Sequence, residues 1–259
     1  MKRILICAAL LSCMISGCKK IEKISYSGVF KLDKQVVSGG GKDTVLAKEQ
    51  MKIYTDHNYM YAGMAPDSSV AFGVGSYELD TGNRIVEHNI YNNRALDSTQ
   101  ILVVVIKKTD KGRTQVIPEF ARNKSVVYKM TEEYAKPPTT GPSSLDGTWV
   151  LDNGFRIKGK DTLRLHETPF IVFWGGHCMF IHHYPVNALE TDYKNGFGYG
   201  TFSLKNDTLK EEYKMSSHAV LLNRKFVIKI AFNGQDEYSQ VFEDPETKEQ
   251  TTEIYKRLP

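Results

Sequence analysis

Apolar and polar residues alternate along short stretches of this chain, and clusters of Gly, Asn and Asp separate the stretches. Residues 28–33 illustrate the pattern, because Phe30 and Leu32 lie two positions apart with Lys31 between them. A period of two places apolar side chains on one face of a β-strand. Asn233-Gly234, between alternating residues 225–232 and 237–242, indicates a tight hairpin turn. No stretch has convincing helical periodicity, so residues 131–136 are expected to form at most one or two helical turns.

One strand pattern occurs twice. Residues 72–80 and 197–205 both read aromatic, Gly, any residue, Gly, small, aromatic, any residue, Leu. Other landmarks keep the same order around each copy: openings at 28–33 and 147–152, an identical Gly-Lys-Asp-Thr turn at 41–44 and 159–162, and closings at 126–129 and 253–256. No helix is expected after either Gly-x-Gly, so these glycines are predicted to permit strand coiling and not to bind phosphate. The chain is therefore interpreted as a duplicated β-module.

The two copies are separated by a proline-rich segment. Residues 137–145 contain three prolines and are predicted to be an extended linker between units at 27–136 and 146–259. Each unit is expected to form an antiparallel barrel of about eight strands, because closure removes unpaired sheet edges. Such a barrel is just wide enough to be filled by side chains or to hold one small ligand. A β-sandwich or a partly open barrel is the alternative fold.

The first 17 residues have the features of an export signal. Lys2-Arg3 precede an apolar run over residues 4–15, which is too short to span a bilayer. Ser16-Gly17-Cys18 resembles the lipobox of bacterial lipoproteins, whose cysteine is acylated after cleavage; an ordinary signal peptide with a chance cysteine is the alternative. The resemblance implies a membrane anchor at Cys18 and a tether over residues 18–26. Lys19 stands where an aspartate favours inner-membrane retention in that family, which implies the outer membrane.

Charge and cysteine content exclude two classes. Two of the 34 Lys and Arg residues lie in residues 1–17, so 32 remain against 30 Asp and Glu. A charge so close to balance argues against nucleic acid as a partner. Cys7 and Cys13 leave with the signal and Cys18 is acylated, so Cys178 alone remains. An intrachain disulfide framework is therefore excluded, and buried cores must stabilise the fold.

The second repeat opens and closes with residues that are similar to those of a known family. Gly147-Thr148-Trp149 resembles the Gly-x-Trp motif on the first strand of lipocalins, and Arg257 resembles the basic residue that packs over that tryptophan. The repeated glycine strand further resembles lipocalin-like (calycin-like) domains of bacterial lipoproteins with unassigned function. The first repeat departs from the motif, with Phe30 in place of the tryptophan and Lys129 near the place of the arginine. The resemblance implies structural roles for Trp149, Arg257 and Phe30.

Two non-enzymatic functions fit this reading. The first is binding of a small amphipathic or apolar ligand, such as a lipid, a glycan fragment or a cofactor, by aromatic residues in one or both barrels. The candidate contacts are Phe173, Trp174, Phe180, His182, Tyr199, Tyr54 and Tyr61. Trp174 adjoins Gly175-Gly176 at a predicted hairpin tip, where a large aromatic side chain often faces solvent or a partner. The second function is a protein-interaction or structural module of the envelope, or an inhibitor, with filled barrels.

Catalysis and metal binding are not predicted. Cys178 and His182 on one strand lie about 13 Å apart, too far to share a zinc ion, so a site would need His166 from a neighbouring strand. His166 and His182 are thus weak metal candidates. Cys178 with a nearby histidine is the distant enzymatic alternative, of a hydrolase type. No paired carboxylates indicate acid–base chemistry, so neither catalytic residues nor a cofactor are expected.

Overall fold

The computed structural model describes residues 26–93, 101–165, 169–185, 193–243 and 248–259. The first half of the chain forms a nine-stranded antiparallel sheet in which β1 also pairs with β9, so eight strands close into a barrel and β2 lies outside the ring. The strands are β1 (Gly28–Gly39), β2 (Lys42–Leu46), β3 (Glu49–Tyr54), β4 (Asn58–Met64), β5 (Val70–Leu79), β6 (Arg84–Asn92), β7 (Ile101–Thr109), β8 (Gly112–Asn123) and β9 (Val126–Ala135).

The second half repeats this topology. Strand β10 pairs with both β12 and β18, which closes a second eight-stranded barrel and leaves β11 outside the ring. The strands are β10 (Gly147–Lys158), β11 (Asp161–Arg164), β12 (Phe170–Trp174), β13 (His177–Pro185), β14 (Tyr193–Lys205), β15 (Thr208–Ser216), β16 (Lys225–Phe232), β17 (Glu237–Glu243) and β18 (Gln250–Arg257). A short 3-10 helix, η1 (Ala219–Leu221), follows β15.

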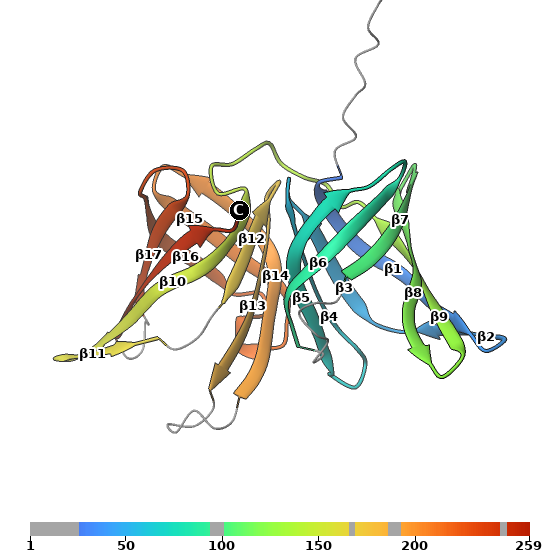
Figure 1. Ribbon diagram of the computed structural model, residues 1–259. Coiled ribbons are helices and arrows are strands. Elements are labelled where there is room, and N and C mark those ends of the chain that lie inside the picture. The colour runs from blue at the N-terminus through green and yellow to red at the C-terminus, as the bar shows by residue number, and fades with distance from the viewer. Residues whose placement is uncertain (1–25, 94–100, 166–168, 186–192, 244–247) are drawn as a thin grey trace, which may run out of the picture.

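The predicted all-β fold of two tandem barrels is confirmed (Figure 1). Each ring is closed, so the sandwich and partly open alternatives are wrong. The strands β2 and β11 were not expected outside the rings; each extends a hairpin with the first strand of its barrel, and these hairpins lie at opposite ends of the molecule (Figure 1). Within the described residues, no helix has the length and apolar character needed to cross a membrane.

The closing strand of the first repeat lies in a different register from the one expected. Leu32 pairs with Tyr134 in the first barrel, as Leu151 pairs with Tyr255 in the second. Residues 131–136 therefore do not form helical turns, because 131–135 belong to β9. Lys129 pairs with Ser38 at the far end of the strand, so it does not occupy the place of the second repeat's arginine. Tyr134, and not Tyr128, is therefore the counterpart of Tyr255, so the local sequence similarity at residues 126–129 misplaced the strand by six residues.

The repeated Gly-x-Gly pattern is explained by rings that lie over the glycines. Tyr61 and Tyr59 pair across β4 and β5 with Gly73 and Gly75, and a side chain on Gly73 would come within 2.8 Å of the Tyr61 ring. In the second barrel Gly198 pairs with Phe180, and a Cβ atom on Gly198 would lie 2.4 Å from the Phe180 ring. A β-bulge at the second glycine of each motif bends the strand. The glycines therefore let aromatic rings fill the barrel while the sheet curves.

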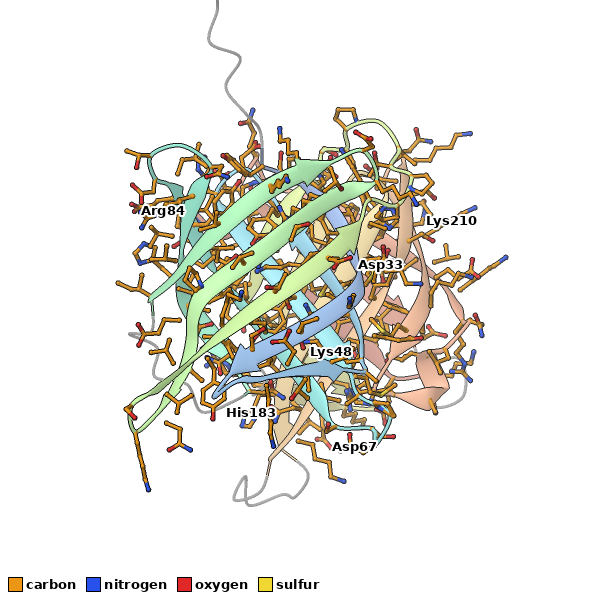
Figure 2. The ribbon with its side chains drawn as sticks, turned by 90° about the vertical axis from the view of Figure 1, so that its right-hand side faces the viewer. Asp33, Lys48, Asp67, Arg84, His183 and Lys210 are labelled. Atoms are coloured by element: carbon orange, nitrogen blue, oxygen red, sulfur yellow. The ribbon has the colours of Figure 1, made fainter. Side chains whose placement is uncertain are left out.

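Apolar side chains form three cores, one inside each barrel and a third between the barrels. The third joins the outer faces of β3–β5 to those of β12–β14, whose strands lie side by side in Figure 1. Its buried members are Val29, Met51, Ile53, Met60, Ala62, Phe72 and Val74 from the first repeat, and Phe170, Val172, Met179, Ile181, Phe197, Tyr199 and Met215 from the second. The linker therefore does not hold the units apart. Elsewhere the outside is charged, with Asp33, Arg84 and Lys210 pointing to solvent (Figure 2).

Candidate functional site

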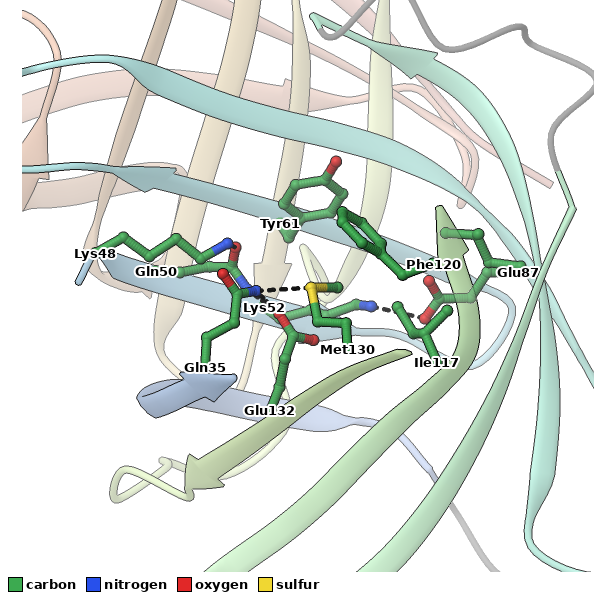
Figure 3. A pocket seen from close by; sticks show the side chains of 11 residues that line it. Gln35, Lys48, Gln50, Lys52, Tyr61, Glu87, Ile117, Phe120, Met130 and Glu132 are labelled. Carbon is green, nitrogen blue, oxygen red and sulfur yellow. Dashed lines mark hydrogen bonds and ion pairs between the residues drawn. The ribbon is translucent and has the colours of Figure 1, made fainter. Parts of the chain in front are cut away.

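The interior of the first barrel contains a charged pocket. Its volume is about 50 Å³, and charged and amide side chains are set in a wall whose exposed atoms are mostly apolar (Figure 3). The lining residues are Gln35, Lys48, Gln50, Lys52, Tyr61, Glu87, Leu102, Ile117, Phe120, Met130 and Glu132. Lys48, Gln50 and Lys52 reach it from alternate positions in and just before β3, because every second side chain of a strand faces the same way. Met51 and Ile53 accordingly face outward, into the core between the barrels.

A buried ion pair lies at one side of the pocket. Lys52 Nζ is 2.7 Å from Glu87 Oε1, and their side chains are only 5% and 2% exposed. The Tyr54 hydroxyl donates a hydrogen bond to the same carboxylate oxygen, and the Lys52 ammonium lies 5.0 Å from the Tyr54 and Tyr59 ring centroids. Burial, and then the charge of Glu87, raise the pKa of the Tyr54 hydroxyl well above its usual range. Tyr54 is therefore a fixed neutral donor.

A second buried carboxylate, Glu132, is held by neutral amides. Gln35 Nε2 donates to Glu132 Oε1 at 2.6 Å, Gln50 Nε2 to the same oxygen at 3.3 Å, and Gln115 Nε2 to Oε2 at 3.3 Å. The Arg113 guanidinium is linked to this group through Gln115 Oε1, at 3.3 Å. Two buried cations thus balance two buried carboxylates across a connected network, which is how charge is tolerated inside a protein.

Arg113 also packs against aromatic rings of the first barrel. Its guanidinium carbon lies 3.6 Å from the Phe30 ring centroid and 4.2 Å from that of Tyr54. In the second barrel the Arg257 guanidinium lies 4.1 Å from the Trp149 ring centroid and donates to the Asp146 carbonyl at 2.6 Å. Each barrel therefore has an arginine over its first-strand aromatic ring, but the first barrel takes it from β8 and not from the closing strand.

Glu87 and Gln35 are buried residues in the wall of the pocket, and both are 2% exposed. Glu87 accepts from Lys52 and Tyr54 through Oε1, and Gln35 donates to Glu132 through Nε2. The Gln50 amide oxygen accepts from Lys48 Nζ at 2.7 Å, and Lys48 is half-buried at the side of the pocket (Figure 3). Polar groups beside a buried cavity usually bond to the protein or to ordered water. The pocket can hold a few waters or a small polar molecule of comparable size.

The interior of the second barrel is filled by its own side chains. Trp149, Phe173, Tyr238 and Tyr255 are at most 2% exposed, and Trp149 Nε1 donates to the Leu145 carbonyl at 2.8 Å. An open groove of about 370 Å³ lies outside this core, between linker residues 140–144 and residues 202–204 of β14. Its lining residues have small hydroxyl or apolar side chains or are glycines, and none of them is charged. The groove therefore offers little for specific recognition.

The carboxylate of Glu211 is buried in the second barrel, near that of Glu253. Burial raises its pKa to about 7, although the Tyr213 hydroxyl donates to Glu211 Oε2 at 2.9 Å and opposes the shift. Burial, and then the charge of Glu211, raise the pKa of the Cys178 thiol well above its usual range. A thiol with a raised pKa is a poor nucleophile at neutral pH. This environment does not favour the hydrolase alternative at Cys178.

Glu211 predicts a pH dependence of stability. Its folded-state pKa is raised above the unfolded value, so the folded protein binds the extra proton and its stability falls as pH rises from about 4.5 to about 7. Glu211→Gln keeps an acceptor for Tyr213 and removes this slope, so the variant is expected to gain about 2 to 3 kcal/mol over the parent at pH 8 and little at pH 4. Urea unfolding at both pH values measures the difference; an equal gain at both would contradict the assignment.

The seven residues predicted to contact a ligand do not converge. Tyr54 and Tyr61 lie inside the first barrel, and Tyr61 alone lines its pocket. Phe173 and Phe180 belong to the core of the second barrel. Trp174 and Tyr199 face the core between the barrels, so Trp174 is half-buried and does not project from the hairpin as an exposed contact. His182 is half-buried beside His218. The set is thus divided among three places.

The remaining predicted positions can also be located. His177 is buried, with Nδ1 bonded to the Tyr199 hydroxyl at 2.7 Å and Nε2 to the linker carbonyl of Pro138 at 2.8 Å, so it fastens the linker. Of the two metal candidates, His166 lies outside the described residues, as does Cys18. No group of three or more His, Cys, Asp or Glu side chains among the described residues could hold a metal ion. His182 has one histidine neighbour.

The residues that make the pocket were missed by sequence reasoning. Lys52 and Glu87 were not among the candidate residues, and charged residues in alternating strands usually face outward. One signal was available: Lys48, Gln50 and Lys52 share one face of a stretch whose other face is Met51 and Ile53. A barrel strand with this pattern turns its apolar face outward, against a neighbouring unit, and its polar face inward.

No family model matches the chain, and no curated protein matches it in sequence. Among solved structures, it is similar to a protein of unknown function from the DUF3598 family of Nostoc punctiforme, with 9% identity and a TM-score of 0.28 over 90% of this chain and 97% of that one. It is also similar to the uncharacterized protein YLR301w of Saccharomyces cerevisiae, with 9% identity and a TM-score of 0.49 over 89% and 98%. Neither similarity is close enough to carry an argument about function.

Proposed function

We propose that this protein is a non-enzymatic envelope lipoprotein whose first barrel binds a small polar molecule. The observation that carries the proposal is the pocket of about 50 Å³ whose wall includes the buried ion pair of Lys52 and Glu87 and a second buried carboxylate, Glu132. A buried ion pair is weak evidence for stability alone, because burying the charges removes their hydration. Charged groups turned toward a cavity are typical of a site that selects a ligand.

The pocket favours a ligand with hydrogen-bond donors and few heavy atoms. Sites for drug-sized or lipid-like ligands usually enclose about 300 to 1,000 Å³, far more than this cavity of about 50 Å³. Lys52 and Glu87 would also lose hydration against an alkyl chain without gaining a partner. The amphipathic or apolar ligand expected from the sequence is therefore replaced in this proposal by a small hydrogen-bond donor.

The envelope role depends on the amino-terminal signal. The lipobox-like Ser16-Gly17-Cys18 and the charged tether after it support acylation of Cys18, and Lys19 supports attachment to the outer membrane. A lipid anchor with two or more chains holds a protein stably at a membrane. The barrels would then be displayed close to the membrane surface, where small solutes of the envelope reach the pocket.

One experiment tests both parts. We expect native mass spectrometry of the protein, extracted from its own membranes, to give a polypeptide that starts at Cys18 and carries acyl chains, together with a small polar adduct that dissociates on collisional activation. Phe120→Trp, which narrows the pocket, is the matched variant and should lose the adduct while keeping the acyl mass. An unmodified amino terminus would contradict the anchor. An adduct that is absent, or that survives in Phe120→Trp, would contradict the pocket.

A protein-interaction role is the second candidate. Strands β2 and β11 lie outside the rings, and their apolar side chains Val45, Leu46 and Leu163 are 63%, 42% and 53% exposed. An exposed strand edge with apolar side chains is a template for pairing with a strand from another chain. The same mass spectra distinguish the two functions, because an interaction module gives an adduct-free barrel.

A further inference from the structure

The two barrels carry acidic residues at equivalent positions of their sheets. Glu87 and Glu211 each pair with the second aromatic residue of the repeated glycine pattern. Glu132 and Glu253 each stand two residues before the tyrosine that pairs with the first-strand leucine. Gln240 Nε2 donates to Glu253 Oε2 at 2.6 Å, as a glutamine of the first barrel does to Glu132. The charged network of the first barrel therefore has a counterpart in the second.

Uncharged residues take the places of both cations in this counterpart. Lys52 and Ile171 each pair with the aromatic residue of the first strand, so an isoleucine stands where the first barrel has its buried ammonium. Arg113 and Tyr238 each pair with the tyrosine of the closing strand, so a tyrosine replaces the guanidinium. Both replacements are buried in the core of the second barrel. The second barrel thus has the two acids without the cations that balance them in the first.

The groups around Glu211 are apolar, neutral or negative. Its partners on the neighbouring strands are Phe202 and Phe226. The ionisable groups within electrostatic reach are Cys178 on β13, Tyr213 on β15, Tyr238 on β17, and Glu253 and Tyr255 on β18. Among the described residues, the buried Tyr238 hydroxyl has no hydrogen-bond partner. An ionised carboxylate is costly in such surroundings, and a buried acid avoids this cost by taking up a proton.

From this comparison we infer that a proton on Glu211 takes the place that the Lys52 ammonium holds in the first barrel, which makes the second barrel a pH-sensitive part of the fold. The carboxyl group takes the proton from solvent as pH falls and returns it as pH rises. Burial raises the pKa of Glu211 to about 7, and the charge of Glu253 adds to this effect, so both forms are populated near neutral pH. Above that pH the barrel contains an uncompensated charge and opens locally more often.

Infrared spectroscopy of the purified full chain tests for this proton, because a protonated carboxyl group has a C=O stretching band separate from that of carboxylates. At pH 6 ordinary Asp and Glu side chains are ionised. We therefore expect a carboxylic acid band at pH 6 that disappears with a midpoint at about pH 7 and is absent from Glu211→Gln. Ile171→Lys places an ammonium at the position equivalent to Lys52 and should abolish the band by pairing with Glu211.

Ile171→Met is the matched control, since it changes the same side chain without adding charge, and it should keep the band. Lys52→Met makes the converse change in the first barrel: Glu87 loses its counter-charge and should give a second carboxylic acid band at pH 6. Circular dichroism checks the fold of every variant. The inference is overturned if the parent has no such band at pH 6, if Glu211→Gln keeps it, if folded Ile171→Lys keeps it, if Ile171→Met loses it, or if folded Lys52→Met gains none.

Discussion

Phe72→Ala is expected to destabilise both barrels together, by about 3 to 5 kcal/mol. Phe72 is fully buried on the outer face of β5, in the core that joins the barrels, and its ring packs against Tyr91 with centroids 6.0 Å apart. Tyr91 in turn stacks on Phe170 of the second barrel at 5.9 Å. Removal of the ring leaves a cavity at this junction that neither barrel can close by itself.

Denaturant unfolding measures this effect with two probes. Both tryptophans, Trp149 and Trp174, belong to the second repeat, so tryptophan fluorescence reports on that half, whereas circular dichroism reports on the strands of both barrels. We expect both probes to shift to the same lower midpoint. Val227→Ala is the control, because Val227 is 65% exposed on an outer face away from the junction and should change stability by less than about 0.5 kcal/mol. A circular dichroism transition that begins at lower denaturant than the tryptophan transition would show that the barrels unfold independently.

The sequence predicts the number and order of strands well because short-range signals determine them. The Asn233-Gly234 hairpin and the paired Gly-x-Gly strands depend on residues that are neighbours in the chain or in the adjacent strand. Barrel closure also follows, since an isolated sheet of this size would leave edges unpaired. These features need no knowledge of how the two repeats meet.

The phase of the alternation is what the sequence does not reveal. In β3 the apolar residues Met51 and Ile53 face the other barrel, and Lys52 faces inward, so the rule that apolar residues point into their own barrel assigns these side chains to the wrong sides. Which face of β3 points inward depends on the outer surface of the second barrel, whose residues lie more than a hundred positions away in the chain. Because the inward face of each strand was unknown, the candidate ligand contacts were chosen by their aromatic character. The charged side chains that face the pocket were therefore missed.

Glu87→Gln is expected to lower the free energy of unfolding by about 3 to 5 kcal/mol, because it leaves the ammonium of Lys52 buried without a counter-charge. Glu87 also accepts the hydrogen bond of Tyr54, so the substitution weakens two buried contacts at one carboxylate. Lys52→Met should cost a similar amount by leaving the carboxylate uncompensated. Urea unfolding at pH 7 measures each single variant.

The double variant Lys52→Met/Glu87→Gln separates stability from binding. It removes both charges while the methionine and the amide keep most of the volume, and replacing a whole buried pair by neutral side chains is often neutral or stabilising. We therefore expect stability within about 1 kcal/mol of the parent and a clearly favourable coupling energy between the two positions. A double variant that is as unstable as the sum of the singles would show that the pair is not coupled. If the pocket serves a ligand, the stable double variant loses the small adduct, since the charges are present for recognition and not for the fold.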